Sequence, residues 1–371
     1  MAMNLSKVLL IAAILSLVAG CNTLAKKNDS GVVVARRTQI RSSTAVVAAD
    51  LLEVNRGDAV DILESVDESD PSDNTKKERW LRVRARDEEN TEGWIEARNI
   101  MPEDVLEAAR KLAEEDKDVA AQATGQLRAS SNLRLTPDRS GNENIMMRLE
   151  SGSSFAIVGW KRVPKPKASE AIESDVAPKA GTAQPVSNTR KEGGEENQIE
   201  ETNELWYKVR LPTSTSPAPA GWIYGKQVEL AVPSDIIFYR TGREFVGWQR
   251  LDGDANDLEG SKDKNAGREA RPGSWIILEK SSSNKPQSVS EADFDRIYVV
   301  GYDKRNQEHY TAYRSQDVRG FLPLRVEGKG ENKTFTARVL DERGQIKEAQ
   351  YSIYKDARGI LKVTAPAVAR R

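Results

Sequence analysis

The stretch WLRVR at residues 80–84, followed by EGWIE at residues 92–96, returns later as WYKVR at residues 206–210 and AGWIY at residues 220–224. Apolar and polar side chains alternate along each stretch, as they do in β-strands with one buried face. A repeat at the scale of a domain constrains the fold more strongly than any single motif. The two copies therefore predict two small β-rich domains of the same kind.

Further matching blocks lie upstream in each copy. GDAVDIL at residues 57–63 aligns with GSSFAIV at residues 152–158, and IRS at residues 40–42 aligns with LRL at residues 133–135. Taken in this order, the blocks resemble bacterial Src-homology-3-type (SH3-like) domains. The resemblance implies small β-barrels of a kind that targets envelope proteins to the cell wall or to a peptide.

From the repeat and this resemblance we expect an all-β protein with two SH3-like barrels, a helical connector between them, and a C-terminal antiparallel meander or barrel. The expected boundaries are 1–20 for a signal peptide, 21–32 for a lipidated cysteine and tether, 33–101 for the first barrel, 102–124 for the connector, 125–232 for the second barrel and 233–371 for the C-terminal domain.

Each barrel carries a polar insert before its tryptophan-led strand. In the first barrel the insert is Ser65–Arg79, rich in Asp, Ser and Lys. In the second it is residues 163–204, which contain almost no aromatic or branched apolar residues. Such a segment buries too little surface to offset its ordering entropy, so we expect a disordered loop there.

The N-terminal segment has the pattern of a secretory signal. Lys7 precedes a run of apolar and small residues, 8–18, which is shorter than the roughly 20 residues that a membrane-spanning helix needs. The segment closes with VAGC at residues 18–21 and so resembles the bacterial lipobox. This resemblance implies that Cys21 is acylated and anchors the chain to a membrane. The following Asn22 implies sorting to the outer membrane, facing the periplasm, if the bacterium is diderm.

The composition excludes several functional classes. The chain has one cysteine, one histidine and a formal net charge of −1. With its cysteine acylated it has no thiolate nucleophile, and one histidine cannot supply the ligands of a zinc hydrolase. The alternating residues around His309 predict a surface or half-buried histidine, not a catalytic one. The balanced charge gives no reason to expect nucleic acid, and we expect no cofactor.

Strand alternation places the tryptophans on the polar faces of the barrels, away from the aliphatic residues. One interpretation is an aromatic groove edged by cations, suited to a Pro-rich peptide, a glycan or a peptide stem. The other is that each barrel covers its own rings with neighbouring Arg and Lys stems. The candidate ligand-binding residues are Trp80, Arg82, Trp94, Trp206, Lys208, Trp222 and Tyr224.

The C-terminal third reads as a series of short strands separated by glycine turns. The expected strands are Ile236–Tyr239, Phe245–Gln249, Trp275–Glu279, Ile297–Tyr302, Tyr310–Tyr313, Phe321–Val326, Phe335–Leu340, Glu348–Tyr354 and Ile360–Val363. Asp252, Asp254, Asn256 and Asp263 have the spacing of calcium-loop ligands, but Asp257 stands where such a loop requires glycine. We therefore expect a solvated acidic loop there.

Three hypotheses for function remain. The first is a non-enzymatic lipid-anchored envelope protein whose barrels bind peptidoglycan or an envelope protein or peptide. The second is a structural scaffold that spaces the C-terminal domain from the membrane. The third is glycan hydrolysis by an Asp/Glu pair within 233–371. No such pair stands out among the 57 acidic residues, so we expect no enzyme.

Overall fold

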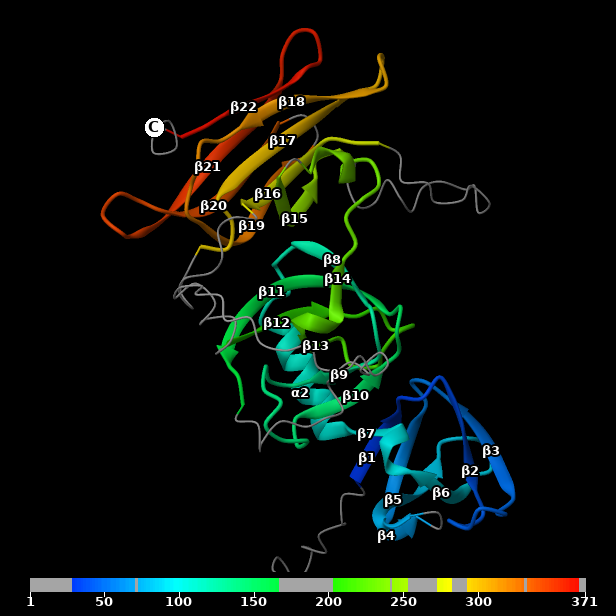
Figure 1. The fold of residues 1–371 in the computed structure, drawn as a ribbon. Coiled ribbons are helices and arrows are strands. Elements are labelled where there is room, and N and C mark those ends of the chain that lie inside the picture. Colours follow the sequence, from blue (N-terminus) through cyan, green and yellow to red (C-terminus); the bar gives the residue numbers. More distant parts are fainter. Residues whose placement is uncertain are drawn as a thin grey trace, which may run out of the picture. The chain divides into compact units, whose positions relative to one another are not determined.

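The computed structural model describes residues 29–70, 73–166, 203–240, 242–252, 272–281, 292–329 and 332–366. It is all-β, as expected, with antiparallel sheets and a single α-helix among these residues (Figure 1). The chain divides into two compact units, Met1–Glu103 and Asp104–Arg371. Cys21, the expected signal peptide and residues 254–263 of the expected acidic loop lie outside the described residues. No helix in the described part of the chain is long and apolar enough to cross a membrane.

The first unit is one seven-stranded sheet with the order β3-β2-β6-β5-β4-β1-β7. Because β3 and β7 stand at the two ends of this order, we call the curved sheet the first half-barrel. Its elements are β1 (Asp29–Val33), β2 (Arg37–Arg41), β3 (Asp50–Asn55), β4 (Ala59–Asp70), β5 (Asp73–Ala85), β6 (Glu92–Glu96), the 3-10 turn η1 (Ala97–Asn99) and β7 (Ile100–Pro102).

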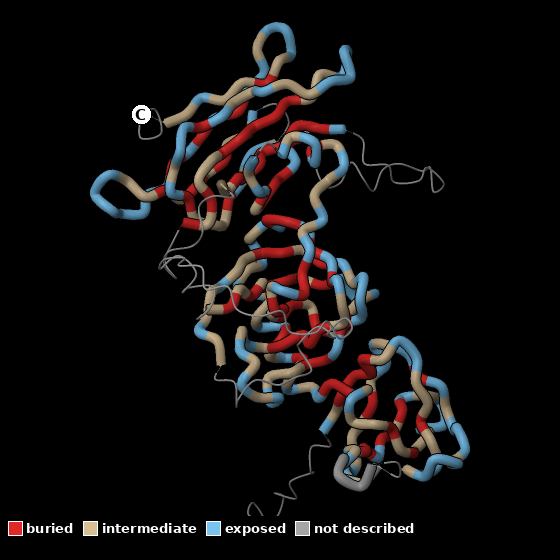
Figure 2. Tube along the Cα trace, in the orientation of Figure 1, coloured by how far each residue is buried: buried red, intermediate tan, exposed pale blue. Residues whose placement is uncertain are grey.

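Alternation along the strands fills the concave side of this sheet with aliphatic residues. Leu81 and Val83 of β5 and Ile95 of β6 belong to a single buried cluster, together with Val33 and Ile40 of the first two strands. In Figure 2 the buried residues of each half-barrel gather in its interior. The half-barrel therefore has a core of its own and begins at β1, four residues before the expected boundary at residue 33.

The polar segment Ser65–Arg79, expected as an insert, is instead a continuous β-hairpin. β4 and β5 pair from Val60↔Ala85 out to Asp70↔Asp73, with irregularities at two places. Polar residues remain stable in this extension because they pair across the strands, as Arg79 does with Asp67 at 2.7 Å. The polar insert expected at this position is therefore an extension of β4 and β5 in the described residues of this segment.

The second half-barrel repeats the first in strand order, β10-β9-β13-β12-β11-β8-β14. Matching turns also share a glycine with positive φ, Gly57 at 94° and Gly152 at 82°, a conformation that costs glycine little. Its elements are β8 (Ala123–Leu127), β9 (Ser131–Arg134), β10 (Ile145–Leu149), β11 (Ser154–Pro164), β12 (Asn203–Arg210), β13 (Ala220–Tyr224), the 3-10 turn η4 (Gly225–Gln227) and β14 (Val228–Leu230). The sequence repeat is thus a structural duplication.

Two expected segments have different limits in the structure. The insert, expected as a loop over 163–204, begins and ends in strand, since Val163 pairs with Glu204 and Pro164 with Asn203. Its middle, residues 167–202, lies outside the described residues.

The α-helix α2 (Glu103–Glu114) is about three turns long, not the five turns expected over 102–124. The helix ends where side chains of β12 bind the residues that follow it. Arg210 donates a hydrogen bond to the carbonyl oxygen of Asp116, and Lys208 pairs with Glu115 and Asp116.

The C-terminal region contains two four-stranded antiparallel sheets, not one open meander or barrel. One sheet is β15 (Arg243–Arg250), β16 (Trp275–Ser281), β17 (Arg296–Asp303) and β18 (Glu308–Arg314), and the other is β19 (Gly320–Lys329), β20 (Asn332–Leu340), β21 (Ile346–Lys355) and β22 (Leu361–Thr364). Ile276 and Val299 of the first sheet share a buried cluster with Phe335 and Tyr351 of the second. The two sheets therefore form a sandwich over a common core.

The expected strand Ile236–Tyr239 is a 3-10 turn, η5 (Ile237–Tyr239). A short apolar run does not distinguish a strand from a turn by periodicity alone. Here Ile236 and Ile237 both donate backbone hydrogen bonds to the carbonyl of Pro233, which closes a turn in place of a ladder.

One buried side chain joins the second half-barrel to the sandwich. Gln122, immediately before β8, accepts a hydrogen bond from the Leu324 amide at 2.7 Å and donates one to the Leu324 carbonyl at 3.0 Å. Its own carbonyl accepts from the Trp248 amide at 2.7 Å. Nearby, the Trp160 indole donates to Asp293 at 2.7 Å. These bonds make the second half-barrel and the sandwich one compact unit.

Candidate functional site

The candidate residues of the first half-barrel lie together on the convex side of its sheet. Arg82 of β5 stands opposite Trp94 of β6, and Trp94 stands opposite Arg41 at the end of β2. Trp80 lies two residues from Arg82 on the same side of β5. The sequence alignment had matched Arg41 with Arg134 but did not identify either arginine as part of a site.

Trp80 is buried, with 5% of its surface exposed, although it points away from the aliphatic core. The Arg41 guanidinium lies 5.8 Å from the centre of its ring, within the range of a cation–π contact. Arg41 also donates to the carbonyl oxygens of Ala45 and Val46, which holds the β2–β3 loop beside it. This favours the interpretation in which the barrel covers its own ring.

Arg82 and Trp94 remain accessible. The Arg82 side chain is 46% exposed, and Trp94 is half-buried. Arg82 and Arg84 share a single carboxylate, Glu92, at 3.1 and 2.6 Å. The hydrogen bond from Arg84, together with the charges of both arginines, holds the pKa of Glu92 below its usual range. One carboxylate thus faces two guanidinium groups.

The equivalent residues of the second half-barrel are covered. Trp206 is fully buried, and its ring lies 5.6 Å from that of Tyr224, which is 6% exposed. The Lys208 side chain is only 10% exposed, because Glu115 lies 2.8 Å from its ammonium group and Asp116 is also paired with it. Of the residues predicted here to contact a ligand, only Trp222 is half-exposed.

A buried ion pair lies beside Tyr224 on this face of the second half-barrel. Arg139, from the β9–β10 loop, pairs with Glu204 of β12, and their side chains are 12% and 1% exposed. The Arg139 guanidinium also lies 5.1 Å from the centre of the Tyr224 ring. Because both charges are withdrawn from water, the pair is fixed in place and does not offer a free cation to a ligand.

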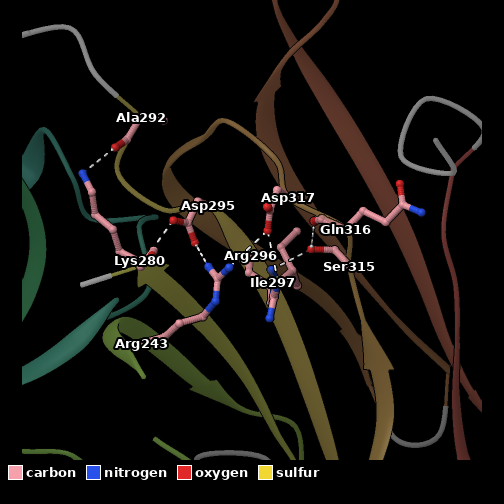
Figure 3. Close-up of polar contacts among 10 residues, drawn as sticks. Arg243, Lys280, Ala292, Asp295, Arg296, Ile297, Ser315, Gln316 and Asp317 are labelled. Carbon is pink, nitrogen blue, oxygen red and sulfur yellow. Dashed lines mark hydrogen bonds and ion pairs between the residues drawn. The ribbon is translucent and has the colours of Figure 1, made fainter. Parts of the chain in front are cut away.

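Two carboxylates of the sandwich, Asp295 and Asp317, are engaged with arginines (Figure 3). Arg243 pairs with Asp295, and Asp317 bridges Arg243 and Arg296 at 3.2 and 3.1 Å. Glu279 of β16 differs: it is buried, and both its oxygens lack a hydrogen-bond partner within the described structure.

Burial raises the pKa of Glu279, although the charges of Arg314, Arg296 and Arg243 oppose the shift. A raised carboxyl pKa is a property of general acids, but such a group must also reach a substrate. Glu279 is 1% exposed and therefore does not reach solvent.

His309 is held by its surroundings. Its side chain is 8% exposed, its Nε2 lies 2.8 Å from the carbonyl oxygen of Gly273, and the Tyr302 ring lies 5.0 Å from its ring. Since a carbonyl only accepts, Nε2 carries the proton of this bond. No group of three or more metal-binding side chains occurs among the residues that the structure describes.

Comparison with known proteins places the chain in no established group. No family model matches it, and no curated protein sequence matches it.

Proposed function

We propose that this chain is a non-enzymatic, lipid-anchored envelope protein whose first half-barrel binds peptidoglycan or an envelope peptide. Acylation at Cys21 supplies the anchor, as the lipobox-like VAGC stretch implies. The two half-barrels belong to one family of SH3-like domains, which their common strand order and their matching 3-10 turns before the last strand support.

The observation that carries the proposal is the difference between the two equivalent faces. Arg82 is 46% exposed beside a half-buried Trp94 and shares its acidic partner Glu92 with Arg84. Its counterpart Lys208 is 10% exposed and is paired with two acids, Glu115 and Asp116. An exposed guanidinium next to a tryptophan recognises carboxylate-bearing and ring-containing groups, and peptidoglycan stems and sugars offer both. The first face is therefore the ligand-binding one.

Co-sedimentation of the full chain with purified peptidoglycan sacculi tests this assignment. Double substitution Arg82→Ala and Trp94→Ala removes the exposed pair and is expected to lower the pelleted fraction at least tenfold. The matched control is Trp222→Ala at the equivalent position of the second half-barrel, which is expected to pellet as the parent does. Equal pelleting by both variants would contradict a site on the first half-barrel.

A second function, that of a scaffold, is supported by the burial of Trp206 and Lys208. In that case neither half-barrel binds a ligand, and no variant pellets with sacculi because the parent does not. Cross-linking of the lipoprotein in cells would then identify the protein that the sandwich contacts. The anchor is tested separately, since Cys21→Ser is expected to move the chain from the membrane fraction to the soluble one.

A further inference from the structure

The β2–β3 loop of the first half-barrel presents two apolar side chains to solvent. Val46 and Val47 are 75% and 93% exposed, and Leu51 at the start of β3 is 47% exposed. Residues 42–49, SSTAVVAA, carry no charge. Exposed valines occur singly on many proteins, but three apolar residues in one hairpin form a patch that calls for a partner.

The loop is held in this conformation by hydrogen bonds. Ser42 donates its amide to the Ala49 carbonyl at 2.9 Å, and the Ala49 amide donates to the Ser42 hydroxyl at 3.1 Å. The Arg41 guanidinium donates hydrogen bonds to the carbonyl oxygens of Ala45 and Val46. With these backbone groups satisfied, the loop presents its side chains in a preformed arrangement, which lowers the entropic cost of inserting them into an apolar phase.

The corresponding loop of the second half-barrel is polar. Residues 135–144, LTPDRSGNEN, contain Asp138, Arg139 and Glu143, and Arg134 donates to Gly141 and Asn144 as Arg41 does to its own loop. The two loops thus share an arginine-centred design and differ in what they expose. The apolar version occurs in the copy next to the lipobox-like cysteine.

The loop also lies at the end of the half-barrel where the chain enters. Asp29 of β1 pairs with Ile62 of β4 in antiparallel fashion, so the chain enters β1 from the direction in which β4 continues toward Asp70. Thr44 donates a 2.6 Å hydrogen bond to Glu68, which places the loop beside that same end of β4.

From these observations we propose that the β2–β3 loop of the first half-barrel inserts Val46 and Val47 into the interfacial layer of the lipid bilayer. The inference rests on the proposed anchor at Cys21. Residues 21–28 reach at most about 28 Å even when fully extended, which keeps the loop within reach of the membrane surface. A bilayer suits the patch because the loop is uncharged, so binding requires no anionic headgroup.

An environment-sensitive fluorophore placed on the loop tests the proposal. The full lipoprotein carrying Val47→Cys is labelled at that cysteine, since acylation occupies the thiol of Cys21, and is reconstituted into phosphatidylcholine vesicles. We expect a blue-shifted emission and at least a twofold loss of intensity with brominated lipids. The control is Glu89→Cys, in the exposed β5–β6 turn at the opposite end of the sheet, where no shift is expected.

Flotation with the vesicles separates the possible failures. If the lipoprotein floats while the probe at residue 47 stays solvent-like, the loop contact is overturned and the anchor stands. If the probe shifts only as the ratio of protein to lipid rises, the loop meets a second copy of the chain and the proposal is overturned. If the protein does not float, the anchor fails and this contact fails with it.

Discussion

At the scale of single residues, the fold places a carboxylate where it finds no hydrogen bond. Glu279 lies on β16 between Phe245 and Arg296 of the neighbouring strands. Its oxygens are buried without a partner within the described structure, and burial raises its pKa from the ordinary value of 4.5. The groups that act on its charge are Arg314, Arg296 and Arg243, which stabilise it, and Asp295, which opposes it.

The burial of Glu279 predicts that the free energy of unfolding depends on pH. A carboxyl whose pKa is raised in the folded state stabilises the fold below its unfolded pKa, and that contribution is lost as the pH rises through the folded pKa. Glu279→Gln removes the titration. The variant is therefore expected to gain stability relative to the parent as the pH rises above the ordinary carboxyl pKa, by on the order of 1 kcal/mol at neutral pH.

Urea unfolding of parent and variant at several pH values measures the difference. The matched control is Glu348→Gln on β21, whose side chain is 62% exposed and so carries no comparable burial cost. Parallel stability curves for Glu279→Gln and the parent would contradict the proposed burial of charge.

At the scale of strands, the β2–β3 and β9–β10 hairpins join the rest of their sheets where β2 pairs with β6 and β9 pairs with β13. The glycine of each Gly-Trp-Ile block lies at that junction. A Cβ on Gly93 would stand 2.5 Å from the Arg41 carbonyl oxygen, and one on Gly221 would stand 2.5 Å from the Met146 side-chain methyl. Both approaches are shorter than normal contacts, so both positions exclude larger residues.

The groups that face Gly93 and Gly221 differ, so replacing each glycine with alanine is expected to lower stability by different amounts. The Arg41 carbonyl belongs to a paired strand and cannot move away, whereas the atoms that face Gly221 belong to side chains, those of Met146 and Leu133, which can shift. Gly93→Ala is expected to destabilise the first half-barrel by about 2–3 kcal/mol. Gly221→Ala is expected to cost about 1 kcal/mol in the second half-barrel. Thermal unfolding compares them, and a larger loss from Gly221→Ala would contradict this explanation.

Strands were also where sequence and structure agreed best. Period-two alternation placed Leu81, Val83 and Ile95 in a core, since the pleat sends successive side chains to opposite faces. It also placed Trp80 and Trp206 on the other face and left open whether the barrels cover these rings, and in the structure both are buried. Their covers are Arg41 for Trp80, and for Trp206 the neighbouring Tyr224, itself covered by Arg139. Such contacts join segments that are distant in the sequence, so the local alternation of residues does not predict them.

The polarity of a segment did not predict the structure of the β4–β5 hairpin, and the apolar run after β14 did not predict its turn. The polar residues 65–79 were expected as an insert before the tryptophan-led strand, yet cross-strand ion pairs such as Asp67–Arg79 accommodate them in strands. Residues 236–239 read as a strand, yet Pro233 nucleates a turn there. In both places a hydrogen-bonding partner, not hydrophobicity, decides the local structure.

At the scale of the whole molecule, the division into Met1–Glu103 and Asp104–Arg371 predicts two unfolding events. The first unit has its own buried cluster, and the second is joined internally through Gln122. Calorimetry of the full chain is expected to show two transitions, with Gly93→Ala lowering only one. A single transition that shifts as a whole would contradict independent units.

The second transition is expected to depend on Gln122. Gln122→Ala leaves the buried amide of Leu324 without its partner, whereas the Leu324 carbonyl keeps a hydrogen bond from Gln249, and the loss costs about 1–3 kcal/mol. Gln126→Ala on the same segment is the control, because Gln126 is exposed and is expected to change stability by less than about 0.5 kcal/mol. Equal effects of the two substitutions would argue against a junction centred on Gln122.

The junction at Gln122 also gives one backbone amide an unusual role. Leu324 lies where the pairing of β19 with β20 is interrupted, between Phe321 and Arg325, so its N–H is bonded to a side chain from the second half-barrel. We therefore expect deuterium to reach that amide when the half-barrel and the sandwich separate or unfold. The hydrogen-exchange rate of this amide therefore reports how often the half-barrel separates from the sandwich. A ligand that stabilises the junction is expected to slow exchange at this amide and to leave the exchange rates of the neighbouring strand amides unchanged.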